Sequence, residues 1–169
     1  MAVSMFRASV PVFAQMLPCL SALLDKATAF AESKKIEPSV LLDARLAPDM
    51  FALTRQVQIA CDFAKGTIAR LAGETPPKYE DTETTIPELK ARIAKTLDFI
   101  KSFKPAQIDG SEEKQITIPI GPETRTFSGE NYLVAHALPN FYFHMTTAYA
   151  ILRHNGVEIG KRDYMRPPG

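Results

Sequence analysis

The chain lacks an excess of either charge: its 20 Lys and Arg residues are balanced by 19 Asp and Glu residues, which gives a formal net charge of +1. Proteins that bind nucleic acid or anionic membrane surfaces concentrate basic residues, and this composition has no such surplus. The sequence also lacks the GxSxG turn of hydrolases, the phosphate-binding P-loop and the glycine-rich dinucleotide turn. We therefore expect neither a nucleic acid nor a membrane as partner. The absence of these motifs also means that the sequence does not indicate a particular reaction.

Cysteine is scarce, with Cys19 and Cys61 alone in separate apolar segments. Neither belongs to a CxxC pair or a zinc-type spacing, so both are predicted to be buried free thiols. Free thiols are typical of a reducing compartment, which favours a cytoplasmic location. The apolar run from Val10 to Leu24 follows Arg7 as in a signal peptide, but two prolines and a glutamine interrupt it, and its periodicity favours a core helix.

The composition is that of a globular protein, with 46% hydrophobic and 23% charged residues, and we expect residues 1–169 to form one domain. Four segments have apolar residues at the three- and four-residue spacing of a helix. Their approximate ranges are 9–30, 48–73, 85–103 and 129–155. Three long connections separate them, and long crossovers permit a bundle that is not simply up-down-up-down. Glu80, Asp81 and Glu83 in the second connection are expected to be solvated.

Particular residues mark the ends of these helices. Ser9 before Val10-Pro11 is a start signal for the first helix, and Pro18 inside it should bend it. Gly73 suits a left-handed cap at the end of the second helix. Thr85 and Glu88 form a capping-box pattern at the start of the third. That helix has one apolar stripe, and its other face is predicted to meet water through Lys90, Arg92, Lys95, Asp98 and Lys101.

The period changes to two between the third and fourth helices. Residues 115–120 alternate, and residues 124–127 follow them after a Gly121-Pro122 turn, which predicts a short β-hairpin. The fourth segment has no Asp, Glu, Lys or Arg between Glu130 and Arg153 and is long enough to span a membrane, but it has too many polar residues for lipid. We predict an all-α four-helix bundle with a small β-hairpin, in which the fourth helix is central and most buried.

Buried polar residues are the informative ones, because an unpaired polar group in a core costs about 1–3 kcal/mol. Asn140 and His144 lie four residues apart on the fourth helix, and Gln58 and Asp62 lie four residues apart on the second, next to Arg55. One interpretation is a solvated seam or a hydrogen-bond network that fixes the register of the bundle. The other is a small-molecule pocket between the second and fourth helices, lined by Gln58, Asp62, Asn140 and His144.

Three stretches of the chain resemble an uncharacterised family of bacterial and fungal proteins. They are LLDARLAPDMF at residues 41–51, LPNFYFH at residues 138–144 and TTAYAILRHNGV at residues 146–157. That family is similar to the DinB-like and YfiT-like superfamily of metal-dependent bundles. The resemblance implies an up-down-down-up arrangement of four helices and a homodimer. The aromatic excess on the fourth helix also favours a homodimer, because burying apolar surface drives association.

Members of the superfamily that bind a metal carry one histidine on the second helix and an HxxxH pair on the fourth. The resemblance matches His144 to the last of these, Asn140 to the other member of the pair and Gln58 to the second-helix ligand. Amide oxygens are poor ligands for zinc or nickel, so we expect no bound metal and no other cofactor. Three hypotheses stay open: a small-molecule binding protein or weak enzyme, a structural or interaction protein, and a metal-dependent transferase or hydrolase that uses His144 with Asp62.

Overall fold

The structure is a computed structural model and describes residues 3–166. The helical elements are α1 (Met5–Lys34), α2 (Pro38–Leu42), α3 (Leu53–Ala72), α4 (Ile86–Lys101), α5 (Pro105–Ile108), α6 (Gly129–Asn131), the π-helix η1 (Tyr132–Ala137), α7 (Leu138–His154) and α8 (Lys161–Met165). The strands β1 (Gln115–Ile120) and β2 (Glu123–Ser128) pair in an antiparallel two-stranded sheet. The chain is therefore mostly helical with one small hairpin, in agreement with the periodicity.

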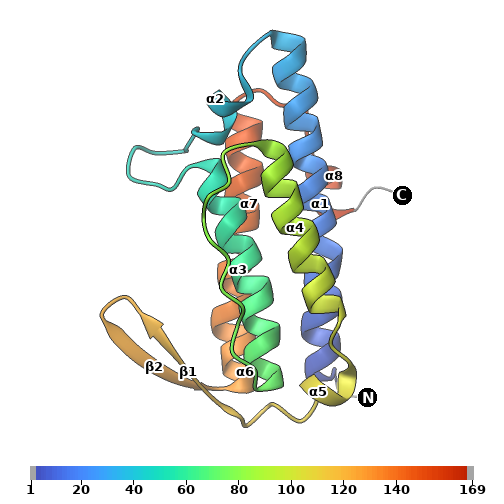
Figure 1. Cartoon of the computed structure of the whole chain (residues 1–169), viewed down its shortest axis with the longest axis vertical. Coiled ribbons are helices and arrows are strands. Elements are labelled where there is room, and N and C mark those ends of the chain that lie inside the picture. Colours follow the sequence, from blue (N-terminus) through green and yellow to red (C-terminus); the bar gives the residue numbers. More distant parts are fainter. Residues whose placement is uncertain (1–2, 167–169) are drawn as a thin grey trace.

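The long helices α1, α3, α4 and α7 lie side by side with the hairpin at one end (Figure 1). The central helix is α3, which packs against α1, α4 and α7. The prediction that the fourth helical segment is the most buried is wrong. Val134 in η1 and Phe143 in α7 are 58% and 55% exposed, because this segment packs mainly through the face that meets α3.

The first helix begins earlier than the sequence signals indicate. Its N-cap is Ser4, whose Oγ accepts a hydrogen bond from the backbone N–H of Arg7, whereas the hydroxyl of Ser9 donates to the carbonyl of Met5 inside the helix. By length and composition α1 is apolar enough to cross a membrane, but half of the apolar window is buried inside the molecule. Its buried side chains include Phe13, Leu17, Leu20, Leu23 and Leu24, which identifies it as a core helix.

The connection from α3 to α4 runs back along α3 without regular secondary structure (Figure 1). We call residues 74–84 the strap. Gly73 ends α3 in the left-handed conformation with φ of 84°, as predicted. The predicted capping box also forms: the Thr85 hydroxyl accepts from the backbone N–H of Glu88 at 3.3 Å, and the Glu88 carboxylate accepts from that of Thr85 at 2.9 Å.

The strap overturns one prediction about the third helix of the sequence, α4. Arg92 was expected to face water, yet it is only 4% exposed, because the carbonyl of Glu80 and the carboxylate of Glu83 in the strap accept hydrogen bonds from its guanidinium. Glu83 is correspondingly not a solvated loop residue, since its side chain is 13% exposed. A long connection that packs along its own helices removes a face from water in a way that helical periodicity does not reveal.

The hairpin and the π-helix close one end of the molecule. Ile116 and Ile118 of β1 are buried, so this face of the hairpin packs on the helices. The segment that follows is π-helical rather than α-helical just before Pro139, which has no backbone N–H to continue an α-helical ladder. The side chain of Asn140 donates to the carbonyl of His136 at 2.7 Å. Such π-turns interrupt α-helices frequently at functional sites.

Candidate functional site

Two of the four predicted site residues, Gln58 and Asp62, belong to an ionic cluster around Arg92. The Arg92 guanidinium contacts Asp62 at 2.8 Å, and it contacts Asp81 and Glu83 at 3.0 Å each. Gln58 donates to Glu83 at 2.9 Å. We call this group the Arg92 cluster; its members are Arg55, Gln58, Asp62, Asp81, Glu83 and Arg92. It joins α3, α4 and the strap, so these two candidates hold the fold together.

Nearly all buried polar atoms of the Arg92 cluster have hydrogen-bond partners, and the cluster packs against the aromatic ring of Tyr79 in the strap. The amines of Lys65 and Lys95 lie 4.7 and 4.1 Å from the centre of the Tyr79 ring, and the Arg92 guanidinium lies at 5.5 Å. These cation–π contacts fix the middle of the strap. Among the members of the cluster, Nε of Arg92 is the one buried side-chain nitrogen or oxygen that has no hydrogen-bond partner in residues 3–166. Burial raises the pKa of the neighbouring Cys61 thiol to about 12, which makes it an inert thiol.

His144 lies on the other side of α3, in a separate hydrogen-bond chain. Its Nδ1 is 2.7 Å from Oε1 of Gln56, and Nε2 of Gln56 donates to the carbonyl of Phe51 at 3.0 Å. Because the Gln56 amide is oriented by Phe51, its oxygen faces the ring, so Nδ1 of His144 carries the proton. Burial, and then the charge of Arg55, lowers the pKa of His144 to about 4. The ring is therefore neutral near pH 7.

The four predicted site residues do not line one cavity. Gln58 and Asp62 join the Arg92 cluster, His144 bonds to Gln56, and Asn140 bonds to a carbonyl of its own helix. Sequence reasoning missed Gln56, although it lies four residues before Ala60 and seven before Phe63 on the same helical face. A helical pattern identifies the face, but only the packed structure decides which of two nearby glutamines meets the histidine.

The residues that the resemblance matches to a metal site do not fit a metal. The amide of Gln58 is engaged by Arg55 and Glu83, and Nδ1 of His144 is engaged by Gln56. Within residues 3–166, no three His, Cys, Asp or Glu side chains gather in a group able to hold a metal ion. The imidazole and thiolate ligands that zinc and nickel prefer are therefore not assembled at this position.

A different cavity lies between α3, β1 and η1. It has a volume of about 200 Å³, and we call it the η1 pocket. Its walls are Asp62, Phe63, Arg70, Ile118, Pro119, Tyr132 and His136. Polar and charged groups thus come together with aromatic and aliphatic walls, which is the usual make-up of a small-molecule site. Asp62 is the one predicted site residue that lines it.

Arg70 and Tyr132 form the charged side of the η1 pocket. Nη1 of Arg70 donates to the Tyr132 hydroxyl at 3.1 Å, and its guanidinium lies 6.0 Å from the centre of the Tyr132 ring. Arg70 is half-buried and Tyr132 is almost fully buried. Among the described residues, no Asp or Glu side chain forms an ion pair with Arg70.

His136 forms the aromatic side of the η1 pocket. Its ring centre lies 5.4 Å from that of Phe127 and 5.8 Å from those of Phe63 and Tyr132. Burial lowers the pKa of His136 from its ordinary value, and the charges of Arg70 and Arg125 lower it further. The imidazole is thus neutral near pH 7. Its ring nitrogens form no hydrogen bond with another group of residues 3–166, so they are free to bind a ligand.

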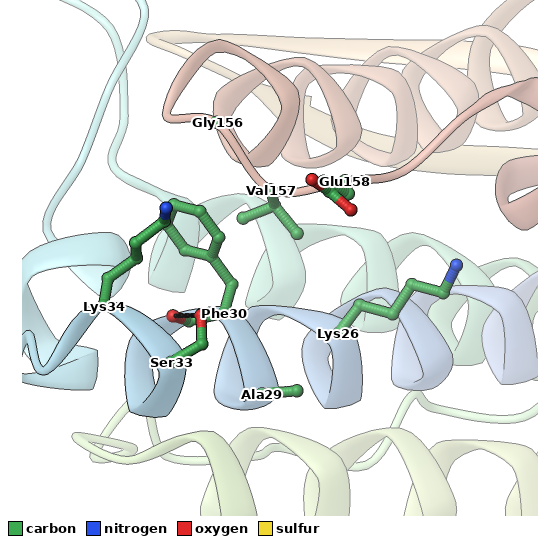
Figure 2. A pocket seen from close by; sticks show the side chains of 8 residues that line it. All are labelled: Lys26, Ala29, Phe30, Ser33, Lys34, Gly156, Val157 and Glu158. Atoms are coloured by element: carbon green, nitrogen blue, oxygen red, sulfur yellow. Dashed lines mark hydrogen bonds between the residues drawn. The ribbon is translucent and has the colours of Figure 1, made fainter.

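A wider groove of about 400 Å³ lies on α1 near the end of α7 (Figure 2). Figure 2 shows Lys34 beside the Phe30 ring and Lys26 further along the helix, with Val157 and Glu158 facing them. The Lys26 amine is bound to Asp163 at 2.7 Å, and the Lys34 amine lies 5.9 Å from the centre of the Phe30 ring. Because Lys26 is already paired with a carboxylate and no histidine lines this groove, it is a weaker candidate than the η1 pocket.

Comparison with known proteins identifies the family. The model of a domain of unknown function, DUF1993, matches residues 5–165. This chain belongs to the DUF1993 family. The DUF1993 chain is also similar to a crystal structure of a DinB family member protein from Shewanella denitrificans, with 49% sequence identity and a TM-score of 0.89 over 95% of this chain and 90% of that one. No curated protein matches it. These findings confirm the resemblance to an uncharacterised DinB-like family.

Proposed function

We propose that this DUF1993 protein binds a small organic molecule in the η1 pocket. The observation that carries the proposal is a cavity where the Arg70 guanidinium, which has no acidic partner in residues 3–166, and a neutral imidazole meet aromatic walls beside a π-helix. The volume of about 200 Å³ is equivalent to about seven water molecules at about 30 Å³ each, which fits a metabolite with a single ring. The proposal keeps the interhelical location expected from the sequence but replaces three of the four lining residues.

A metabolite screen by heteronuclear NMR tests this proposal. We expect a ligand to shift signals of Phe63, Tyr132 and His136 in a saturable way, while Gln56 beside His144 is unaffected. His136→Leu should weaken binding about tenfold or more by removing the neutral imidazole from the wall. His154→Leu is the matched control, because it removes an exposed histidine at the far end of α7. Saturable shifts confined to the region around His144 would contradict the proposal.

A structural or interaction role is the second candidate, and a specific observation favours it. The Arg92 cluster ties the strap to two helices with nearly every polar atom paired, as in a network that fixes helix register.

We further propose that α1, α3, α4 and η1–α7 constitute an up-down-down-up bundle. The strap returns the chain along α3, which supports that order (Figure 1).

We also propose a cytoplasmic location, which the buried free thiols of Cys19 and Cys61 support.

We also propose that the protein forms a homodimer through a helix face. The exposed apolar side chains of Val134, Tyr142 and Phe143 support this, since exposed apolar patches commonly mark interaction sites. Light scattering should give twice the chain mass of 18.7 kDa at micromolar concentration, and Phe143→Ser should shift the population towards monomer. Thr146→Ser, an exposed position on the same helix, is the control: it removes one methyl group, far less apolar surface than the loss of a phenyl ring. A monomer at all concentrations would contradict the proposal.

A further inference from the structure

We infer that the ligand of the η1 pocket carries an oxyanion, a carboxylate or a phosphoryl group, on a small apolar body, and that Arg70 binds this oxyanion. The inference rests on the proposed function, because it names the chemical class of the molecule bound at that site. A guanidinium suits the role, since its planar fork of N–H donors matches the two oxygens of a carboxylate or phosphoryl group.

The charge pattern around the pocket favours an anion. Arg55 and Arg92 both pair with carboxylates, whereas the half-buried Arg70 has no acidic partner among residues 3–166. Asp62 also lines the pocket, but its Oδ1 already contacts the Arg92 guanidinium at 2.8 Å and the Lys65 amine at 2.9 Å. Two cations therefore neutralise Asp62, and the open charge of the cavity is that of Arg70. A half-buried guanidinium is only partly hydrated and keeps N–H donors available, so an oxyanion gains charge-assisted hydrogen bonds there.

The local sequence of α3 makes room for the Arg70 guanidinium. A Cβ atom at Gly66, one helical turn earlier, would lie 2.6 Å from Nη1 of Arg70, closer than two such atoms can approach. The Tyr132 hydroxyl then accepts a hydrogen bond from the same nitrogen and fixes its direction. An alanine at position 66 would therefore make the flexible end of the Arg70 side chain move away from its place beside Tyr132. The guanidinium is thus held in place before any ligand arrives.

The remaining walls select an apolar body with a single charged group. Phe63, Ile118 and Pro119 offer carbon surface, and His136 is neutral near pH 7, so Arg70 is the one cation among the described residues that line the cavity. A flat ring can stack on the aromatic wall while its charged end reaches Arg70. The volume of about 200 Å³ accommodates a ring and one head group, and the rest of a larger ligand would lie in solvent because the pocket is open on one side.

Three probes with the same ring and different head groups test the inference: benzoate, phenylphosphonate and the neutral benzamide. NMR titrations of the full chain at constant ionic strength follow the signals of Phe63, Tyr132 and His136. We expect at least one of the two anions to bind about tenfold more tightly than benzamide, because hydrogen bonds to charged groups are the stronger ones. The preferred anion distinguishes a carboxylate ligand from a phosphoryl ligand.

Matched variants assign the preference to Arg70. Arg70→Gln should abolish the anion preference, so that benzamide and the two anions bind equally. Gly66→Ala should reduce the preference, because a Cβ atom there displaces the flexible end of the Arg70 side chain; alanine at position 66 favours the helix, so that variant should remain folded. Arg153→Gln removes an exposed arginine from the last turn of α7, at the other end of that helix, and should keep the preference. Equal affinities for benzamide and both anions in the unchanged protein would overturn the inference and leave the binding pocket standing. No saturable shift with any probe would overturn both.

Discussion

The Arg92 cluster and the η1 pocket share Asp62 and lie against the same helix, yet they differ in how far their charges are paired. Arg92 contacts three carboxylates and is almost completely buried, whereas Arg70 contacts a tyrosine hydroxyl and has no acidic partner in the described chain. The difference indicates two roles for arginine in one small protein. A closed set of ion pairs holds the strap against the helices, and an open guanidinium beside a cavity has capacity for a ligand.

The largest expected effect comes from breaking the closed cluster. Arg92→Met should lower the free energy of unfolding by about 3 kcal/mol, because it leaves the nearly buried Glu83 carboxylate without a cation, while Asp62 and Asp81 keep Lys65 and Arg55. Arg92→Lys should recover only part of the loss, since an ammonium does not reproduce the fork. Denaturant unfolding monitored by circular dichroism measures both variants.

The same substitution in the open pocket is the control for this comparison. Arg70→Met should change the free energy of unfolding by no more than about 1 kcal/mol, because it breaks one hydrogen bond and no ion pair. Similar losses in Arg92→Met and Arg70→Met would remove the distinction between a closed and an open site. It would mean that both arginines serve mainly to stabilise the fold.

A smaller effect on stability concerns His144, whose hydrogen-bonding capacity is used within the protein by Gln56, as that of Arg92 is used by its carboxylates. In the folded protein its pKa is about 4, below the ordinary value of 6.5. As the pH falls from 6.5 to about 4, His144 becomes protonated in the unfolded chain but stays mostly neutral in the folded protein. Protonation therefore favours the unfolded state, and the protein loses up to about 3 kcal/mol of stability from this group. Above pH 6.5 this contribution is fully present. Urea unfolding across this range measures the loss.

Substitution of His144 isolates this contribution from the carboxylates that titrate nearby. His144→Gln removes the titration but keeps a hydrogen-bonding side chain next to Gln56, so its stability should depend less steeply on pH between 6.5 and about 4. His154→Gln changes an exposed histidine of the same helix and should keep the full dependence. A His144→Gln protein with an unaltered pH profile would show that the buried ring has no part in it.

Much of the backbone could be predicted from the sequence because local rules dominate there. The pair Thr85 and Glu88 forms its capping box, and Gly73 ends its helix in the left-handed conformation that its missing side chain permits. The alternation of residues 115–120 gives a strand with Ile116 and Ile118 buried. Each of these signals is read within a few residues of chain, so no knowledge of distant segments is needed.

The candidate site depended instead on contacts between distant segments. Whether Gln56 or Gln58 meets His144 depends on the rotation of α3 against α7, which a helical period specifies only to within a face. The burial of Arg92 depends on a strap of no regular structure, and the η1 pocket on how β1 and η1 close over α3. Sequence alone determined the helices, the caps and the hairpin; the tertiary structure decided which polar groups are satisfied, because that depends on partners far away in the chain.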